Sequence, residues 1–339
     1  MSCSVIPAGY KSILSLYETQ SAIGKIKGGF AENLSAELNL KRVSAPLFVL
    51  PQTGLNDDLN GVERPVEFEI KETGTKAQIV HSLAKWKRMA LHTYEFPMGE
   101  GIYTDMNAVR RDEEMDNLHS VYVDQWDWEK VIAKEQCSLD YLKRAVQGIV
   151  SAICDTAEQI KEKWGERYPI FCEVPCRDVK FITTQELEDM YPKLTPKARE
   201  NVFLKEHKTA FVMQIGGKLK SGEIHDGRAP DYDNWQLNGD ILFWNDILNC
   251  AFEVSSMGIR VDAQTLDKQL YSASCNERRE LLFHKMLLSG ELPQTMGGGI
   301  GQSRLCMLLL KKAHIGEVQS SVWDEKTIDI CHGAGINLL

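Results

Sequence analysis

The run from Gly297 to Arg304 carries the clearest sign of chemistry in the sequence. It reads Gly-Gly-Gly-Ile-Gly-Gln-Ser-Arg, and the apolar stretch Leu305 to Leu310 follows it directly. Glycines let backbone N–H groups approach an anion closely, and a helix N-terminus adds a favourable partial charge. We therefore expect a glycine-lined helix start on which Arg304 clamps the phosphates of a nucleotide. The alternative is a glycine-rich turn before a buried helix.

Two other nucleotide-binding motifs do not fit the sequence. The pattern G-x-G-x-x-G fails because Gln302 and Arg304 stand where its last glycine would fall, and G-x-x-x-x-G-K-[ST] does not occur. Neither a dinucleotide-binding fold nor a Walker phosphate loop is predicted.

Two carboxylates interrupt apolar segments. Asp240 precedes the run Ile241 to Trp244, and Glu253 lies between Phe252 and Val254. A carboxylate that faces a sheet interior is costly unless it is paired or bound to a cation. Mg²⁺ uses few protein carboxylates and shares its other positions with phosphate oxygens and water. The sequence thus predicts Asp240 and Glu253 as Mg²⁺ ligands, and the alternative is a pair of edge residues that reach solvent.

Further polar residues gather in a strand and in several loops. The segment from 119 to 129 alternates as a strand, which places Gln125 and Asp127 side by side on one face. Charged patches that are candidates for function, or else ordinary solvated loops, lie at 56–58, 81–87, 110–113, 226–233 and 253–260.

The elements that must position these residues are a sheet and several helices. Helical periodicity covers 11–38, 82–92 and 134–163. Strands are expected at 43–50, 67–70, 77–80, 119–129, 209–216, 239–244 and 251–256, with a hairpin turn at Thr73-Gly74. Few helices separate neighbouring strands, so we expect an antiparallel sheet within an α+β fold. We expect one catalytic domain over 1–339 with a helical insertion at about 134–207.

Composition narrows the class of protein. The 339 residues are 43% hydrophobic, and the longest apolar run, Leu305 to Leu310, is far too short for a membrane span. We expect a cytoplasmic protein without a membrane partner. A net charge of -9 disfavours nucleic-acid binding. The nine cysteines show no disulfide framework and are expected to be reduced thiols.

The chain resembles a known family in several of these segments. Pro46, Arg110 and the glycine-led helix with Arg304 are similar to the three motifs of class II aminoacyl-tRNA synthetase catalytic domains. Longer segments resemble the ammonia-dependent asparagine synthetases, a tRNA-free relative of that class. These are His-Ser-Leu-Ala-Lys-Trp-Lys at 81–87, the strand at 119–129, Arg-Ala-Pro-Asp-Tyr-Asp at 228–233, Leu-Asn-Gly-Asp at 237–240 and Ser-Ser-Met-Gly-Ile-Arg-Val-Asp at 255–262. The resemblance implies an antiparallel sheet of six to eight strands flanked by helices, in a homodimer.

The resemblance also implies a reaction. Members of the family join L-aspartate and ammonia while ATP is cleaved to AMP and pyrophosphate, through a β-aspartyl-adenylate. It implies catalytic roles for Arg110 at the α-phosphate and for Arg304 at the terminal phosphates, with Mg²⁺ on Asp240 and Glu253. We expect Asp57 to be the general base that takes a proton from ammonium. The other implied nucleotide-binding residues are Arg228, Asp233, Gly299 and Gly301, and the aspartate-binding residues are Ser82, Ala84, Lys87, Gln125, Asp127, Ser256 and Arg260.

Three other functions compete with this interpretation. Glutamine-dependent synthesis is disfavoured because Cys3 stands behind Ser2, whereas that chemistry uses an N-terminal cysteine. A tRNA-charging synthetase is the nearest rival, and the segments that resemble the family leave little room for an anticodon-binding domain. A catalytically inactive regulator that only binds amino acid or nucleotide is disfavoured because four polar residues are present together. They are Arg110, Asp240, Glu253 and Arg304.

Overall fold

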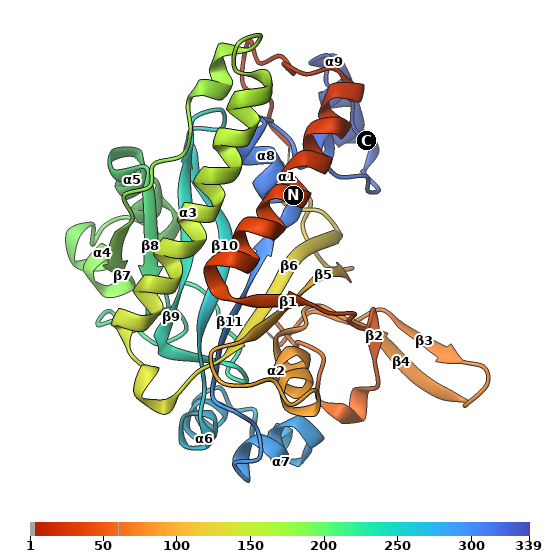
Figure 1. Ribbon diagram of the computed structural model, residues 1–339, viewed down its shortest axis with the longest axis vertical. Coiled ribbons are helices and arrows are strands. Elements are labelled where there is room, and N and C mark those ends of the chain that lie inside the picture. The colour runs from red at the N-terminus through yellow and green to blue at the C-terminus, as the bar shows by residue number, and fades with distance from the viewer. Residues whose placement is uncertain (1–3, 60) are drawn as a thin grey trace.

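The computed structural model describes residues 4–59 and 61–339, and their centre is an eight-stranded sheet (Figure 1). Its strand order is β1-β5-β6-β11-β10-β9-β8-β7. In that order the strands span Leu40–Arg42, Gly101–Val109, Tyr122–Val131, Thr295–Gly301, Cys250–Arg260, Asp233–Asn245, Thr209–Met213 and Lys180–Thr183. The expected strand count and α+β class are thus confirmed.

The expectation of a wholly antiparallel sheet is only partly right. The six central strands pair antiparallel, but β1 pairs parallel with β5 and β7 pairs parallel with β8 at the two edges. A parallel pair needs a crossover connection, and both pairs have one. The second sheet and α2 (Ala84–Thr93) separate β1 from β5, while α4 (Thr184–Met190) and α5 (Pro196–His207) separate β7 from β8. The result is a mixed sheet.

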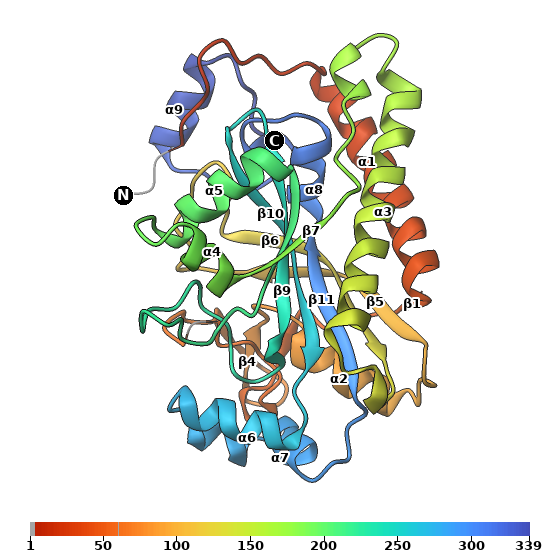
Figure 2. The same cartoon turned by 90° about the vertical axis from the view of Figure 1, so that its left-hand side faces the viewer.

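Two long helices cover one face of the sheet, α1 (Leu16–Leu38) and α3 (Leu139–Trp164) (Figure 2). The helix predicted from Lys11 begins at Leu16 because Ser15 caps it, and Ser15 and Glu18 form a capping box. Phe30 of α1 packs on Trp126 of β6 with ring centroids 4.6 Å apart. The apolar face of β6 therefore points to α1, and its opposite face, with Gln125 and Asp127, points away.

A second, three-stranded sheet extends from the body of the molecule (Figure 1). It consists of β2 (Phe48–Val49), β3 (Glu67–Ile70) and β4 (Thr75–Ile79), in the order β2-β4-β3. The expected hairpin is confirmed, whereas the strand expected over 43–50 is wrong. β1 ends at Arg42, before that segment, and only Phe48–Val49 within it form a strand, which is β2 of the second sheet. Pro46 lies in the extended link between β1 and β2.

The remaining helices are short. They are α6 (Ala263–Ser272), α7 (Leu282–Leu288), α8 (Gln302–Leu309) and α9 (Glu325–Gly333). Within 134–207, the region expected as a helical insertion, α3 packs along α1 and β7 forms an edge of the main sheet. Among the residues that the structure describes, no helix is long and apolar enough to cross a membrane.

Candidate active site

One pocket of about 410 Å³ opens on the face of the sheet opposite α1. Every residue predicted above for a catalytic, substrate, nucleotide or metal role lines it. They are Asp57, Ser82, Ala84, Lys87, Arg110, Gln125, Asp127, Arg228, Asp233, Asp240, Glu253, Ser256, Arg260, Gly299, Gly301 and Arg304. These positions are far apart in the chain, so the fold brings together the residues that the sequence singled out.

The floor of the pocket follows from the strand register. On β6, Gln125 and Asp127 line the pocket, and the buried Glu129 lies on the same strand face. The three residues pair with Gly301, Gly299 and Gly297 of β11. A Cβ on Gly297 would lie 2.7 Å from both the Arg260 guanidinium and the Glu129 carboxylate. The glycines therefore leave room for polar side chains that reach across β11 from both neighbouring strands.

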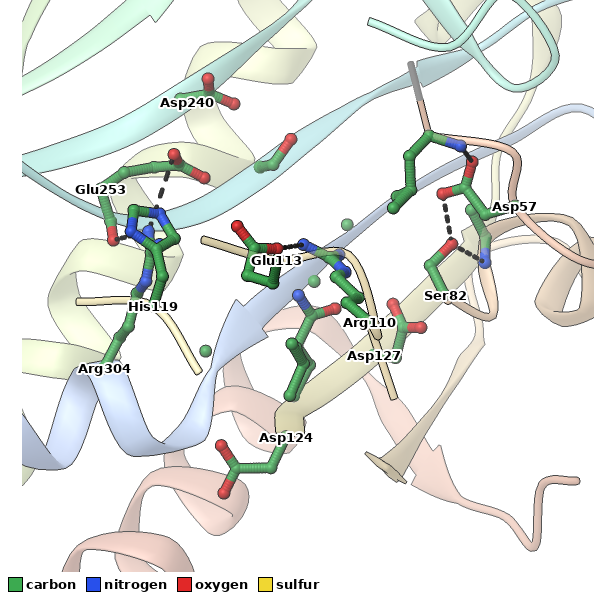
Figure 3. A pocket seen from close by; sticks show the side chains of 18 of the residues that line it. Asp57, Ser82, Arg110, Glu113, His119, Asp124, Asp127, Asp240, Glu253 and Arg304 are labelled. Carbon is green, nitrogen blue, oxygen red and sulfur yellow. Dashed lines mark hydrogen bonds and ion pairs between the residues drawn. The ribbon is translucent and has the colours of Figure 1, made fainter. Parts of the chain in front are cut away.

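The expected glycine-lined helix start is wrong in one respect. The glycines belong to β11, which pairs on both sides with β6 and β10. The helix α8 begins only at Gln302, and the backbone N–H of Ser303 donates to the carboxylate of Asp124 at 3.0 Å. A protein carboxylate thus occupies part of the helix N-terminus that the sequence had suggested for phosphate. Arg304, in the first turn, still faces the pocket (Figure 3).

Two guanidinium groups reach the pocket from different elements (Figure 3). Arg304 donates to the backbone carbonyl of Glu253 at 3.0 Å, and its guanidinium lies 3.7 Å from the Glu253 carboxylate. Arg110 follows the last residue of β5 and lies 3.9 Å from Glu113. Within the described chain, Nε of Arg110 is buried and lacks a hydrogen-bond partner. Both arginines have donor capacity left for an anion.

Asp240 and Glu253 lie near each other on β9 and β10, and their charges interact. Burial raises the pKa of Asp240 to about 7; Arg228, at 2.5 Å, opposes this change and Glu253 adds to it. Burial also raises the pKa of Glu253, but Arg304 and Lys197 outweigh it and bring that pKa below its ordinary value. A cation between the two carboxylates would relieve their repulsion.

Asp240 and Glu253 suit a Mg²⁺ ion that takes most of its ligands from phosphate oxygens and water and not from the protein. Residues 4–59 and 61–339 contain no group of three or more histidine, cysteine or acidic side chains suited to hold a metal. Two carboxylates are enough where phosphate oxygens and water complete the octahedron. The pair thus suits an ion that arrives with a nucleotide.

The expected aspartate-binding cations are already paired with carboxylates. Lys87 Nζ donates to Asp127 and, at 3.0 Å, to the carbonyl of Gly298. Burial lowers the pKa of Lys87, and Asp127 partly offsets that change. Asp127 also accepts from the backbone N–H of Leu83 at 3.1 Å. A ligand at this end therefore meets a neutralised pair, not a free ammonium group.

Arg260 is also paired with carboxylates, those of Asp233 and Glu129, and only Asp233 was predicted from the sequence to have a role. Its guanidinium donates to Asp233 and, at 3.0 Å, to Glu129, and Thr295 donates to Glu129 at 2.7 Å. Glu129 is 0% exposed on its side chain. Sequence reasoning missed the role of Glu129, although its place on the same strand face as Gln125 and Asp127 was a usable signal.

Asp57 accepts three hydrogen bonds in the pocket wall. The donors are Ser82 Oγ at 2.7 Å, Tyr232 Oη at 3.0 Å and the backbone N–H of Leu59 at 2.9 Å. Burial, and next the charge of Asp57, raise the pKa of Tyr232 well above its ordinary value. Tyr232 therefore stays protonated, and its hydroxyl donates a hydrogen bond to Asp57. Sequence reasoning gave Tyr232 no role, although the tyrosine stands inside one of the segments that resemble the family.

A buried network behind Asp57 was not predicted at all. His284 lies 2.6 Å from Asp231. Arg278 pairs with two carboxylates, those of Asp231 at 2.6 Å and Asp58 at 3.4 Å. The network ties α7 and the turn before it to the loop that carries Asp57. Asp58 and Asp231 lie in charged patches that the sequence marks, but His284 and Arg278 do not. The pairing could not be predicted because it depends on the packing of distant segments.

Solved structures of other proteins show which fold the chain has. The chain shares its fold with class II aminoacyl-tRNA synthetases. It matches an Entamoeba histolytica asparaginyl-tRNA synthetase in complex with asparaginyl-adenylate with a TM-score of 0.66, at 13% identity, over 90% of this chain and 66% of that one. It matches a Pyrococcus horikoshii asparaginyl-tRNA synthetase complexed with asparaginyl-adenylate with a TM-score of 0.63, at 15% identity, over 89% and 68%.

Comparison with protein families and with curated sequences identifies the family of the chain. The family model for aspartate-ammonia ligase matches residues 17–335. A Clostridium tetani aspartate-ammonia ligase is 60% identical over 336 residues, which are 99% of this chain and 97% of the relative. A Ruminiclostridium cellulolyticum aspartate-ammonia ligase is 56% identical over 340 residues, with full coverage of both chains. The chain belongs to the aspartate-ammonia ligase family, and the sequence-based resemblance is confirmed.

Proposed function

We propose that this enzyme makes L-asparagine from L-aspartate and ammonia, and that it activates aspartate as a β-aspartyl-adenylate with release of AMP and pyrophosphate. Family membership at up to 60% identity supports the overall reaction. The observation that carries the mechanism is the convergence of Arg110 and Arg304 on one pocket that also holds Asp240 and Glu253, two carboxylates whose charges repel. Those groups suit a bent triphosphate.

Activation comes first because a carboxylate is a poor electrophile. The β-carboxylate of aspartate attacks the α-phosphorus of ATP, and pyrophosphate leaves. Negative charge on the phosphates must be neutralised in the transition state. Arg110, with its unpartnered buried Nε, binds the α-phosphate, and Arg304 binds the terminal phosphates. Arg228, Asp233, Gly299 and Gly301 form the rest of the nucleotide site.

Asp240 and Glu253 hold Mg²⁺ with the nucleotide. When bound, the ion supplies charge neutralisation at the phosphate oxygens. The mutual repulsion of the two carboxylates supports this assignment, and so does the pKa of Asp240, which stands at about 7. Arg228 pairs with Asp240 at 2.5 Å and fixes that carboxylate at the edge of the pocket.

Aspartate binds at the other end of the pocket. The lysine of the Lys87–Asp127 pair faces a substrate carboxylate, while Asp127 and Gln125 accept from the substrate ammonium. The binding site extends along Ser82, Ala84, Ser256 and Arg260. Because these cations are already paired, substrate carboxylates join existing networks and do not meet isolated charges.

Ammonia enters mostly as ammonium and must lose a proton before it can attack. We assign Asp57 as the general base. Its carboxylate is 3% exposed and is held by Ser82 and Tyr232, both donors through hydroxyl groups. Fixed donors on one oxygen leave the carboxylate in a defined orientation toward the pocket. The free ammonia then attacks the adenylate carbonyl, and AMP leaves.

We further infer that the enzyme is a single catalytic domain, works in the cytoplasm as a homodimer, and uses no nucleic acid or membrane as partner. The resemblance to the family supports the homodimer. Size-exclusion chromatography with light scattering measures it directly, and a mass near 38.3 kDa would contradict the dimer.

Product identity tests the proposed function. The protein is incubated with ATP, Mg²⁺, aspartate and ammonium, and the products are separated by chromatography. We expect AMP, pyrophosphate and asparagine in equal amounts. Formation of ADP would indicate phosphoryl transfer and contradict the adenylate route. Charging of asparagine or aspartate onto tRNA would instead support the rival synthetase function.

A further inference from the structure

The first turn of α8 has no cap of its own. Its N-cap residue is Gly301, which has no side chain to accept a hydrogen bond from the exposed N–H groups. Asp124 on β6 takes over that function, since its Oδ1 accepts from the Ser303 N–H at 3.0 Å. A strand carboxylate thus caps a helix that begins 178 positions later along the chain, counted from Asp124 to Gln302.

Neighbours on three elements hold the Asp124 carboxylate. Lys27 of α1 donates to Oδ2 at 2.9 Å, and Gln319 donates to Oδ1 at 3.3 Å and to Ser303 Oγ at 3.1 Å. Asp124 is 5% exposed, and Figure 3 shows its carboxylate pointing away from Arg110 and Asp127. Its contacts therefore involve α8 and α1 and none of the groups assigned to aspartate.

Arg304 directly follows the capped residue. Its backbone lies in the same first turn of α8, and its guanidinium crosses to β10, where it donates to the Glu253 carbonyl at 3.0 Å. The residues after it, from Leu305 to Leu309, are buried in the core. The helix is therefore anchored at its end by packing and at its start by Asp124.

We infer that Asp124 is a positioning residue that sets the first turn of α8 and so places the Arg304 guanidinium for the phosphates of ATP. This inference rests on the proposed ATP-binding role of Arg304. Asp124 does not touch the nucleotide in this account; it acts through the helix backbone.

Charge balance explains why a carboxylate can stand so near a phosphate site. An anion at a helix N-terminus is favourable, but it would repel a triphosphate nearby. Lys27 pairs with Asp124 at 2.9 Å, and its positive charge opposes that repulsion. Lys27→Met should therefore weaken ATP binding although Lys27 lies on α1, on the far face of the sheet.

Asp105 offers a matched control, because it contacts Gln302, the residue directly before Ser303. Gln302 donates through its side chain to Asp105 of β5 at 2.9 Å, so Asp105 contacts the same helix turn without capping its backbone. Asp105 is 41% exposed on its side chain. Asp105→Ala should leave the KM for ATP unchanged.

A double-mutant cycle on the full-length enzyme tests the inference. Steady-state KM and kcat for ATP and for aspartate are measured for Asp124→Ala, Arg304→Ala, the double variant and Asp105→Ala. We expect Asp124→Ala to raise the KM for ATP about five- to tenfold, as for loss of a helix cap, with the KM for aspartate unchanged. In the Arg304→Ala background the same substitution should change the KM for ATP less than about twofold.

The outcomes separate this inference from the proposed function. An equal effect of Asp124→Ala with and without Arg304, or no effect at all, would overturn the positioning role while the role of Arg304 stands. An Arg304→Ala variant with normal ATP kinetics would overturn both. If Asp124→Ala does not fold, Asp124→Val and Asp124→Asn replace it in the same cycle. Val removes the acceptor for the Ser303 N–H and should raise the KM for ATP as expected for Ala, whereas Asn keeps an acceptor oxygen and should change that KM less than about twofold. An equal KM for the two variants would overturn the positioning role.

Discussion

The two ends of the pocket hold their cations in opposite ways. At the nucleotide end, Arg304 is 20% exposed on its side chain, and Nε of Arg110 has no partner within the described chain. At the amino-acid end, Arg260 is 2% exposed and lies between Glu129 and Asp233, and Lys87 is paired with Asp127. Arg110 and Arg304 therefore keep donors free for an anion, whereas Lys87, Arg260 and, at the nucleotide end, Arg228 are already paired with carboxylates.

This difference indicates what each end contributes. The Arg110 and Arg304 side chains are 24% and 20% exposed, so both can bind an anion and contribute little to folding. Fully buried pairs cost desolvation free energy when they form, and breaking one leaves a charge buried and unpaired. Substitutions at the nucleotide end should therefore impair catalysis, and substitutions at the amino-acid end should first impair folding.

The largest effect is expected for Glu129→Ala. It leaves Arg260 with one carboxylate in a buried site and leaves Thr295 without its acceptor. We expect the free energy of unfolding to fall by about 3 to 5 kcal/mol, measured by urea titration. Arg110→Ala is the control from the other end and should change it by less than about 0.5 kcal/mol. Equal losses of stability in the two variants would contradict the proposed difference between the two ends of the pocket.

Arg304→Ala should show the opposite behaviour. We expect kcat/KM for ATP to fall by the equivalent of about 2 to 4 kcal/mol in transition-state stabilisation, with the urea midpoint nearly unchanged. The measurement is initial-rate kinetics at saturating aspartate and ammonium. An unchanged rate would show that Arg304 does not bind the phosphates. Arg167→Ala is the control, because Arg167 is 71% exposed on its side chain and does not line the pocket.

Asp57→Asn divides the reaction into its two halves. Aspartate-dependent exchange of pyrophosphate into ATP should stay largely intact, whereas asparagine formation should slow by about a hundredfold because the proton acceptor is lost. Tyr232→Phe is the companion variant and should reduce asparagine formation less, since it removes only one donor to Asp57. Equal loss of exchange and synthesis in Asp57→Asn would refute the general-base assignment.

Asp240 should make stability depend on pH. Its pKa rises from 3.8 to about 7 on folding, chiefly through burial. Between these values the folded protein holds a proton that the unfolded chain has lost, so stability falls as pH rises from about 4 to 7, by up to about 1.4 kcal/mol per pH unit. Urea titrations across this range should show the slope reduced in Asp240→Asn. If the free energy of unfolding changed with pH equally in both proteins, Asp240 would not be the cause of the pH dependence.

The smallest effect is expected for Arg64→Ala. Arg64 pairs with Asp112 at 2.5 Å, but its side chain is 69% exposed. Surface pairs of this kind contribute little because water screens them. Neither the urea midpoint nor kcat/KM should change, and a clear loss in either would show that the exposed loops matter more than the two ends of the pocket.

The sequence predicted the residues of the pocket better than their partners. Arg110, Asp240 and Arg304 could be found because each breaks a local pattern, and all of them line the cavity. The pairing of Arg260 with Glu129 across β11 could not be found, since it depends on strand register and on the missing Cβ of Gly297. Local sequence does not encode which strands become neighbours.

The errors of secondary structure have the same origin. The glycine run was expected to begin a helix, and it forms β11 because β6 and β10 supply partners on both sides. The two parallel edges of the sheet arise from long crossovers, in which the order of strands is set by packing over the whole chain. Periodicity along the chain gives the type of an element and not its neighbours.

Isotope exchange between pyrophosphate and ATP, measured without ammonium, tests the central claim most directly. If the pocket adenylates aspartate before ammonia is needed, labelled pyrophosphate should enter ATP when aspartate and Mg²⁺ are present. Arg304→Ala should lower the exchange rate by the equivalent of about 2 to 4 kcal/mol. No exchange without ammonium, in an enzyme that still makes asparagine, would contradict the adenylate and the roles given to both arginines.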